Sequence, residues 1–335
     1  MMKIALDAMG GDYAPRINVE GALLAVQKSG IPVILVGDQP KIQKELRRSH
    51  FSTNLIEIIH ASENIGMHEK ATESLRSKKN TSMGVALELL RDHKVDAVVS
   101  PGHTGAFMAL STLVLKRLPG IERPAIAGCI PTLKGSAVML DLGANVDCKP
   151  SQLVQFAVMG SLYAKIVEKH ENPKIGLLSN GEEESKGNEL TRQVHQILKT
   201  KNLNYVGYVE SKEIFKGRVD VVVCDGFTGN IFLKTIEGAL STTASLLKQE
   251  IGKRPFSKLL VGMFYLLFKD TLHSLGRRFD YAEYGSAPLL GLNGVVHVCH
   301  GRSSSKAIKN AILTASKSVE TKFLESLKQE LETLL

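Results

Sequence analysis

Residues 220–232 read Asp-Val-Val-Val-Cys-Asp-Gly-Phe-Thr-Gly-Asn-Ile-Phe, and residues 96–108 carry the same pattern as Asp-Ala-Val-Val-Ser-Pro-Gly-His-Thr-Gly-Ala-Phe-Met. Each copy predicts a short buried strand, a Gly-x-Thr-Gly turn and the first turn of a helix with apolar periodicity. Glycines let backbone N–H groups approach a ligand, the threonine adds a hydroxyl donor, and a helix N-terminus favours negative charge. The repeat therefore predicts an α/β fold that binds an anion.

Strand signals alternate with helix signals along the rest of the chain, which predicts a mostly parallel sheet with helices on both faces. The expected strands are residues 3–8, 33–36, 55–60, 96–100, 136–141, 174–179, 205–209 and 220–224. In an open sheet of this kind, the carboxyl ends of the parallel strands surround the ligand crevice. The glycine-bearing loops expected to converge there are residues 9–12, 102–105, 142–145, 180–182 and 226–229.

The chain is long enough to bury a large core, and no low-complexity linker divides its 335 residues. We therefore expect a single α/β domain over residues 1–335. Residues 231–280 are predicted to leave the sheet as a protruding helical hairpin, with its turn at residues 252–255. The last thirty residues are predicted to form one closing amphipathic helix.

Most of the net charge of +8 lies in the expected hairpin. Residues 248–278 hold seven Lys or Arg against Glu250 and Asp270, a balance of +5, and they include the ten-residue apolar run Leu259–Phe268. A run of this length cannot cross a bilayer, but an apolar face with basic flanks suits an element that touches a membrane surface. Packing in the core or at a subunit interface is the alternative.

Several functions are not expected from this composition. The N-terminus lacks the order of a signal peptide and no apolar run reaches the roughly 18 residues that span a bilayer, so we expect a cytoplasmic protein or one at a membrane face that touches the cytoplasm. The four cysteines are scattered, and strand alternation separates His300 from His297 and Cys299, so no metal site is expected. The usual dinucleotide and nucleotide phosphate-binding motifs are missing, and the positive charge is too local to predict nucleic-acid binding.

Six motifs in order closely resemble the PlsX family of phosphate acyltransferases. They are residues 7–12, 104–106, 141–145, 181–183 with 186–188, 224–230 and 289–292. The resemblance implies transfer of a fatty acyl group from acyl carrier protein to inorganic phosphate, giving acyl phosphate for phospholipid synthesis. It also implies a homodimer with a fold like that of the isocitrate and isopropylmalate dehydrogenases, and peripheral association with the inner face of the cell membrane. There, a membrane acyl-phosphate:glycerol-3-phosphate acyltransferase of the PlsY type would accept the product.

This reaction exchanges one activated acyl group for another, so no cofactor is expected. A phosphotransacylase that uses coenzyme A thioesters and a nicotinamide-dependent dehydrogenase on a related fold are the alternative functions. Cys224 ends its strand beside the second Gly-x-Thr-Gly loop, and we interpret it as a buried structural cysteine rather than a nucleophile.

The two Gly-x-Thr-Gly loops and the loop at Gly181 supply the expected site residues. One loop would cradle phosphate and another would donate N–H groups to the carbonyl oxygen that becomes negative. We expect phosphate at the second loop, with Asp225 or His103 orienting it and Lys186 or Lys234 balancing its charge. The expected catalytic residues are Asp225, Thr228, Asn230 and Lys186. The expected substrate ligands are Gly10, Gly11, Gly102, His103, Thr104, Gly105, Gly181, Gly226, Gly229 and Lys234, and the expected membrane contacts are Leu260, Phe264 and Leu267.

Most of these residues also have a purely structural interpretation. The loop glycines would serve tight turns, Thr104 and Thr228 would cap helices, and Asp225 would bind the N-terminus of its own helix. Lys234 and the run 182–184 would be solvated. The chain also departs from the pattern of the family it resembles, which usually has Asp, Asn, Asn, Gly and Gly at His68, His103, Tyr208, Ser211 and Ser286.

Overall fold

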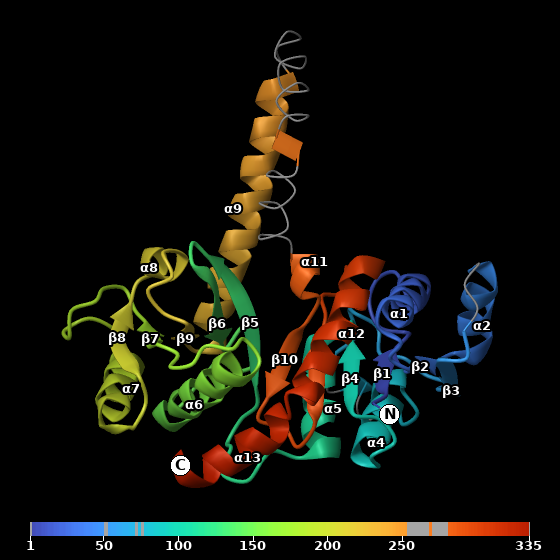
Figure 1. The fold of residues 1–335 in the computed structure, drawn as a ribbon, viewed down its shortest axis with the longest axis horizontal. Coiled ribbons are helices and arrows are strands. Elements are labelled where there is room, and N and C mark those ends of the chain that lie inside the picture. Colours follow the sequence, from blue (N-terminus) through green and yellow to red (C-terminus); the bar gives the residue numbers. More distant parts are fainter. Residues whose placement is uncertain are drawn as a thin grey trace.

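The computed structural model describes residues 2–49, 53–70, 73–74, 77–252, 268–269 and 281–334 (Figure 1). The strands in this part of the chain are β1 (Ile4–Asp7), β2 (Val33–Gly37), β3 (Ile56–His60), β4 (Ala97–Ser100), β5 (Ala125–Thr132), β6 (Gly135–Leu140), β7 (Ile175–Leu178), β8 (Tyr205–Val209), β9 (Val221–Val223), β10 (Ala287–Leu290) and β11 (Val295–Val298). The helices are α1 (Arg16–Ser29), α2 (Gln39–Arg48), α4 (Ser82–Arg91), α5 (Thr104–Leu115), α6 (Pro150–Ile166), α7 (Glu189–Thr200), α8 (Ser211–Phe215), α9 (Gly226–Gly252), α11 (Tyr281–Tyr284), α12 (Ser305–Glu320) and α13 (Phe323–Leu334).

The strands form one 11-stranded sheet in the order β3-β2-β1-β4-β11-β10-β5-β6-β9-β7-β8. Pairing is parallel from β3 to β11 on one side and from β6 to β8 on the other. Between these two halves, β10 and β5 pair antiparallel with each other and with their outer neighbours. The predicted α/β fold with a mostly parallel sheet is confirmed, and the predicted strands correspond to β1–β4 and β6–β9.

The strands that the sequence patterns miss are β5 and β10, which join the two halves, whereas the segment at His297 that is interpreted as a strand corresponds to β11. Gly128 and Pro131 lie within β5 and Pro288 within β10, and such residues hide a strand pattern. Three successive antiparallel pairings link β11 to β6, so the two parallel halves run in opposite senses.

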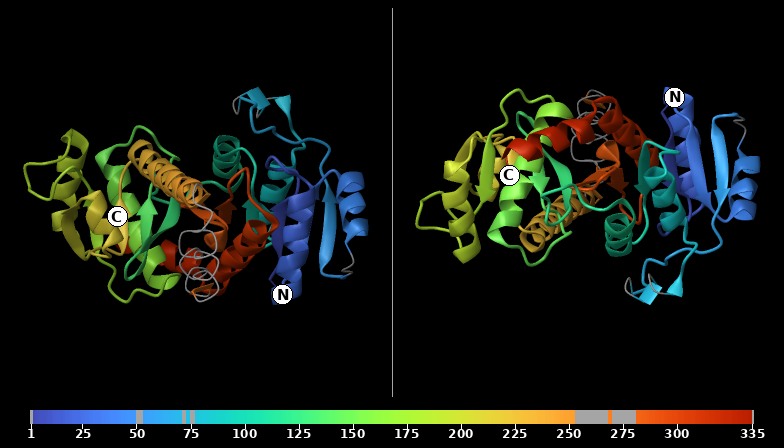
Figure 2. Two further views of the ribbon diagram at one scale, coloured as in Figure 1. Left: turned by 90° about the horizontal axis from the view of Figure 1, so that it is seen from above. Right: turned by 90° about the horizontal axis from the view of Figure 1, so that it is seen from below.

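Helices cover both faces of the sheet along its length (Figures 1 and 2). In the first half, Leu6 packs with α1 and α12 on one face, and its neighbour Ala5 packs with α4 and α5 on the other. In the second half, Val221 packs with α6, α7 and α13, and Val222 with α8 and the foot of α9. Ala5 and Val222 belong to one continuous core cluster. Helices α5 and α9, which follow the two Gly-x-Thr-Gly loops, therefore lie on the same face of the sheet.

Helix α9 rises from the body of the protein (Figure 1). Its 27 residues would extend about 40 Å. The helix begins at Gly226, inside the second loop, so the excursion starts earlier than the predicted residue 231. Only its foot, at Phe232 and Leu233, packs against the core. Farther along, Leu240, Leu246 and Leu247 are exposed.

The remainder of the predicted hairpin, including Leu260, Phe264 and Leu267, lies outside the described residues. Among the helices that the structure describes, none combines the length and the apolar character that a bilayer span requires.

The closing segment is two helices, which corrects the predicted single helix. Helix α12 ends at Glu320 with Thr321 as its C-cap, and Lys322 follows with φ of 51°, in the left-handed region that a continuous helix cannot contain. The chain then turns into α13, whose Phe323 ring meets Tyr163 of α6 edge-on at a centroid distance of 5.4 Å. This turn lets the end of the chain cross from the first half to the second.

His297 is a fully buried histidine in β11. Its Nδ1 lies 3.0 Å from the Ser286 hydroxyl, and its Nε2 lies 3.3 Å from the Ser318 hydroxyl. Burial lowers the pKa of His297 to about 3, so the fold accommodates the neutral ring. Ser286 thus supplies one of its two partners.

Acid should destabilise the protein through His297. The unfolded side chain has a pKa of about 6.5, so above that pH neither state binds the proton. Between that pH and about 3, only the unfolded chain binds it, and the free energy of unfolding falls by about 1.4 kcal/mol per pH unit. We expect His297→Gln to be less stable than wild type at pH 7, by a margin that shrinks by about 2 kcal/mol at pH 5. Urea unfolding at both pH values measures this margin, and a margin independent of pH would contradict the expectation.

Candidate active site

A buried aspartate holds the first Gly-x-Thr-Gly loop in place. Asp7 ends β1, beside β4, and its Oδ2 accepts a hydrogen bond from the Ser100 hydroxyl at 2.8 Å. The same hydroxyl oxygen accepts from the Gly102 N–H at 3.1 Å, and Met9 N–H donates to Asp7 Oδ1 at 3.1 Å. Burial raises the pKa of Asp7, and the serine hydrogen bonds oppose that rise. Asp7 thus ties the loop after β1 to the loop after β4.

The loop after β1 packs against the loop after β4 without room for a side chain. A Cβ added to Gly10 would lie 2.6 Å from the Gly102 nitrogen and 2.6 Å from Asp7 Oδ2. A Cβ on Gly11 would lie 2.9 Å from the Gly301 carbonyl oxygen. The structure therefore brings the expected residues Gly10, Gly11 and Gly102 together.

His103 is the N-cap of α5, a role that sequence analysis offered to Thr104. Its Nδ1 accepts from the Ala106 N–H at 3.3 Å. Thr104 is the first residue of the helix and is exposed. Within the described part of the chain, neither the Thr104 hydroxyl nor the N–H groups of Thr104 and Gly105 meet a protein acceptor. The first loop therefore offers several free donors at a helix N-terminus.

A second buried aspartate occupies the equivalent place in the other half. Asp141 follows β6, beside β9, and its Oδ1 accepts from the N–H groups of Ile126, Gly143 and Ala144 at 3.0, 3.3 and 3.0 Å. Its Oδ2 accepts from Asn145 N and Nδ2 at 2.7 and 2.9 Å. Five N–H groups thus surround one carboxylate. The loop after β6 is a nest of donors that is already filled by the chain's own anion.

Asp225 caps α9 and uses the donors of the second loop. Its Oδ1 accepts from the Thr228 N–H at 2.8 Å, and its Oδ2 accepts from the Thr228 hydroxyl at 2.8 Å. Gly226 N–H donates to the Asn145 carbonyl at 2.7 Å, and Gly229 N–H to the Asp225 carbonyl at 2.9 Å. The structural interpretation of Asp225 as a capping residue is confirmed, and Thr228 is bound by that cap.

Gly229 seats the first turn of α9 on the loop after β6. A Cβ on Gly229 would lie 1.9 Å from the Asp141 carbonyl oxygen and 3.0 Å from Cys224 Sγ. The next residue, Asn230, lies against Gly143, with its Cβ 3.5 Å from where a Gly143 Cβ would be. Cys224 is buried and burial raises the pKa of its thiol, so it is a packing residue, as expected.

The sequence repeat is therefore part of a larger duplicated unit. In each half, a strand that ends in a buried aspartate pairs in parallel with the strand that carries the Gly-x-Thr-Gly loop. The sequence patterns gave no role to Asp7 or Asp141, although each lies at the end of a predicted apolar strand, just before a glycine-bearing loop. That placement is the signal that could have found them. The two units differ at their threonines: the Thr104 donors of the first have no protein acceptor among the described residues, whereas Asp225 binds both the N–H and the hydroxyl of Thr228 in the second.

The third expected loop lies after β7 and carries Lys186. Gly187 N–H donates to Asn180 Oδ1 at 3.0 Å, which closes the loop, and the Lys186 stem packs on Gly181. Glu182 pairs with Arg218, and Glu184 pairs with Lys199. These carboxylates are exposed and ion-paired, which agrees with their structural interpretation. Lys234 of α9 is likewise paired with Glu237 at 2.7 Å.

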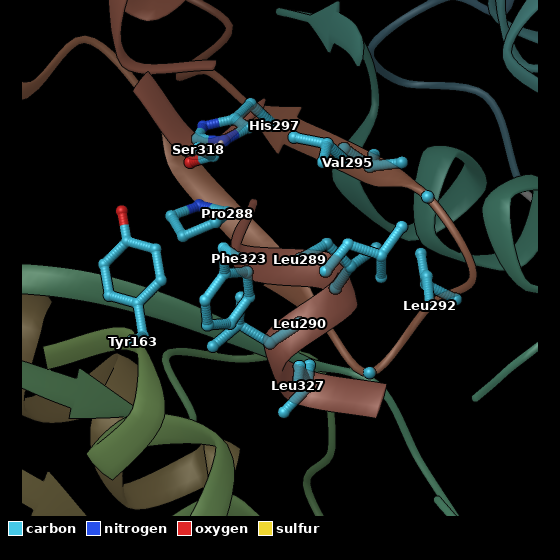
Figure 3. A pocket seen from close by; sticks show the side chains of 14 residues that line it. Tyr163, Pro288, Leu289, Leu290, Leu292, Val295, His297, Ser318, Phe323 and Leu327 are labelled. Carbon is cyan, nitrogen blue, oxygen red and sulfur yellow. Dashed lines mark hydrogen bonds between the residues drawn. The ribbon is translucent and has the colours of Figure 1, made fainter. Parts of the chain in front are cut away.

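The three loops are not joined to one another by any hydrogen bond or ion pair among the described residues. A cavity of about 20 Å³ lies elsewhere, between α6, α13 and the strands β10 and β11 (Figure 3). Tyr163, His297 and Ser318 are its polar lining residues, and no residue of the three loops reaches it. In the same described ranges, no group of three or more His, Cys, Asp or Glu side chains is placed to bind a metal ion.

Comparisons with known proteins agree on one family. The family described as fatty acid synthesis protein matches residues 2–326. The chain is 55% identical over 314 residues to the phosphate acyltransferase of Pelobacter propionicus, covering 94% of this chain and 90% of that protein. It is 51% identical over 332 residues to the phosphate acyltransferase of Geobacter sulfurreducens, covering 99% and 95%.

Solved structures share the fold at low sequence identity. A phosphotransacetylase from Streptococcus pyogenes is 19% identical with a TM-score of 0.61, covering 95% of this chain and 94% of that one. The 4-hydroxythreonine-4-phosphate dehydrogenase of Klebsiella pneumoniae is 13% identical with a TM-score of 0.56, covering 95% and 99%. At this identity the likeness concerns the fold alone.

Proposed function

This chain belongs to the phosphate acyltransferase family, and from that membership we propose that it transfers a fatty acyl group from acyl carrier protein to inorganic phosphate. The products would be acyl phosphate and the free carrier thiol. The observation that carries the proposal is the first loop, where Thr104 and Gly105 present unpaired donors at a helix N-terminus. Such donors suit phosphate because the N–H groups point at the ligand and the helix dipole favours negative charge.

We propose the first loop for phosphate, although the sequence favours the second. A dianion at the second loop would have to displace the Asp225 carboxylate from Thr228 and would be repelled by it. The second loop retains the Phe227 N–H and the Asn230 side-chain amide, which have no partner among the described residues. These two groups would donate to the thioester oxygen as it becomes negative, at about 3 kcal/mol per donor.

The sheet geometry supports one site that uses both loops. Adjacent strands rotate by about 20–25°, so the five pairings from β4 to β9 rotate the strand direction by roughly 100–125°. The antiparallel pairings alone would set β4 and β9 at about 180° to each other. The accumulated twist reduces this angle, so the two strand directions lie roughly 55–80° apart. Their carboxyl ends thus turn toward a common side, and α5 and α9 already share one face of the sheet.

The chemistry needs no group that the chain lacks. An oxygen of hydrogen phosphate would attack the thioester carbonyl carbon, the new C–O bond would replace the C–S bond, and the leaving thiolate would take up the proton that the phosphate loses. Phosphate is itself the nucleophile, so the buried Cys224 thiol is not required. Holding phosphate beside the carbonyl supplies much of the rate. Lys186 would balance the phosphate charge, because its ammonium group has no ion-pair partner among the described residues, whereas Lys234 has one.

The central test is to incubate the purified protein with acyl carrier protein thioester and radiolabelled phosphate. We expect labelled lipid and an equal amount of free thiol, both dependent on phosphate. Thiol release without phosphate would indicate hydrolysis, and the absence of labelled lipid would refute the proposal. A parallel reaction with the coenzyme A thioester distinguishes the carrier: faster transfer from coenzyme A would assign the protein to the phosphotransacylases.

Paired threonine variants decide which loop binds phosphate. Thr104→Val removes the exposed hydroxyl of the first loop, and we expect it to raise the KM for phosphate about tenfold with kcat little changed. Thr228→Val removes a hydroxyl that Asp225 already binds, so its KM for phosphate should stay within about twofold of wild type. Steady-state kinetics at saturating acyl donor measure both. A larger rise in the KM for phosphate in Thr228→Val than in Thr104→Val would assign phosphate to the second loop.

We further propose that the protein is a homodimer that touches the membrane through the excursion at the end of α9 and delivers its product to a membrane acyl-phosphate acceptor of the PlsY type. The protruding helix and its exposed leucines support this, together with the basic, apolar sequence of residues 253–280. We expect wild type to float with liposomes and a Leu260→Glu/Phe264→Glu variant of equal stability to remain unbound. Equal flotation would refute the membrane contact, and a monomeric sedimentation coefficient would refute the dimer.

A further inference from the structure

A buried histidine lies beneath the loop that carries Lys186. His195 of α7 is 4% exposed, and its ring stacks on Tyr208 of β8 at a centroid distance of 4.4 Å and an angle of 15°. Its Nδ1 lies 2.7 Å from the Tyr205 hydroxyl. Burial raises the pKa of Tyr205, so the phenol keeps its proton and can donate it to Nδ1. The hydrogen of the neutral ring then lies on Nε2.

This Nε2 atom is buried and has no hydrogen-bond partner in the part of the chain that the structure describes. A carboxylate is almost within reach, since Glu184 Oε1 lies 4.0 Å away. An approach of about 1 Å would bring the pair to an ordinary N–H···O distance. A buried donor without an acceptor is destabilising, so the fold gains free energy when this contact closes.

Glu184 and Lys186 belong to the same short loop. The loop is closed at its base by the Gly187–Asn180 hydrogen bond and is held there by Arg192, which donates to the Gly187 carbonyl at 2.6 Å. Between these fixed points, Lys186 N–H donates to the Glu183 carbonyl at 2.9 Å, which joins residues 183–186 in one hydrogen-bonded turn. A shift of Glu184 toward His195 therefore also moves Lys186.

We propose that Glu184 and His195 form a latch that positions Lys186 for phosphate, closing when phosphate binds. Both are positioning residues, because neither would touch the substrate. The proposal rests on the proposed function, in which Lys186 balances the phosphate charge. The charged and titratable groups that face His195 are Glu184 from the loop, Lys199 from α7, and Tyr205 and Tyr208 from β8.

The first test removes the charge of the acceptor, because an amide oxygen accepts a weaker hydrogen bond than a carboxylate oxygen. We expect Glu184→Gln to raise the KM for phosphate about fivefold to tenfold, with kcat and the KM for the acyl donor within about twofold of wild type. Glu189→Gln is the matched control, because it removes the same charge from the exposed first turn of α7, away from His195. An equal effect of both variants would mean that only net charge matters and would overturn the latch.

The second test separates the hydrogen bond from packing. His195→Phe keeps a ring to stack on Tyr208 but removes the donor, so it should raise the KM for phosphate as Glu184→Gln does. His195→Gln loses the ring but keeps an N–H near the position of Nε2, so it should stay close to wild type. If His195→Phe is harmless and His195→Gln is impaired, the role is packing and the proposal fails.

The third test asks whether the latch acts through Lys186. In a Lys186→Gln background, Glu184→Gln should add no further rise in the KM for phosphate, and an additive rise would overturn the proposal. A readout without activity comes from NMR titration of the His195 ring. Burial and Lys199 lower the pKa of His195 while Glu184 raises it, so Glu184→Gln should lower it further. An unchanged titration refutes the latch even if acyl transfer is confirmed, whereas failure of transfer alone refutes the proposed function.

Discussion

Replacing Gly229 with alanine is expected to lower the free energy of unfolding by at least about 3 kcal/mol and to abolish acyl transfer. The new methyl group would lie 1.9 Å from the Asp141 carbonyl oxygen, which is backbone and cannot rotate away. The first turn of α9 would have to leave the loop after β6, carrying Asn230 and the Asp225 cap with it. Urea unfolding followed by circular dichroism measures the stability.

Gly238→Ala is the matched control for this prediction, because it makes the same chemical change in the same helix. A Cβ at Gly238 meets nothing within 4 Å. Alanine is the better helix former by up to about 1 kcal/mol, so this variant should be as stable as wild type or more so. A Gly229→Ala protein with the stability of wild type would show that α9 does not sit on Asp141 as described.

Replacing Asp141 with asparagine is expected to cost about 2–4 kcal/mol of stability and most of the activity. The carboxylate accepts five hydrogen bonds, two of them at Oδ2 from Asn145. An amide nitrogen at either oxygen position would face donors instead of acceptors and leave N–H groups unpaired in a buried site. The loop after β6 and the start of α9 would lose their common support.

The control for Asp141→Asn is Asp147→Asn, in the exposed end of the same loop. It makes the same change of charge and shape away from the donor nest, and surface substitutions of this kind stay within about 0.5 kcal/mol. Thermal and urea unfolding of both variants, with transfer rates at saturating substrates, measure the effect. Equal stabilities would mean that water replaces the lost acceptor and that Asp141 is not the support of the loop.

Much of the fold could be predicted from local patterns. The inner strands β1, β2, β4, β6, β7 and β9 are short, largely apolar runs, because a parallel strand covered on both faces buries nearly every side chain, whereas the edge strands β3 and β8 are only partly buried. The glycine-bearing loops were found because turn residues follow those runs directly. The strands that join the halves were missed, since glycine and proline interrupt β5 and β10 and antiparallel pairing leaves no strand-helix alternation to read.

The candidate site could be predicted only in part. The glycines and threonines of both loops were named, and Asp225 was expected as a possible cap of its own helix, but the link from the Gly102 N–H through Ser100 to Asp7 was not predicted. That link depends on the fold, which pairs β1 with β4 and so places Asp7 beside Ser100. The difference between the loops also follows only from the hydrogen bonds. Asp225 and Asn230 make the second loop appear richer in ligands in the sequence, but the Asp225 carboxylate binds the first turn of its own helix.

Two Gly-x-Thr-Gly turns, each between a buried strand and a helix, are local features, and short-range conformational preference and apolar periodicity are enough to specify them. The tertiary structure alone decides that Asp7 and Asp141 support these turns, that three antiparallel pairings reverse one half of the sheet, and that α5 and α9 share a face. These relations join residues that are far apart in the chain. Strand order and register set them, and neither is encoded in the pattern of any single segment.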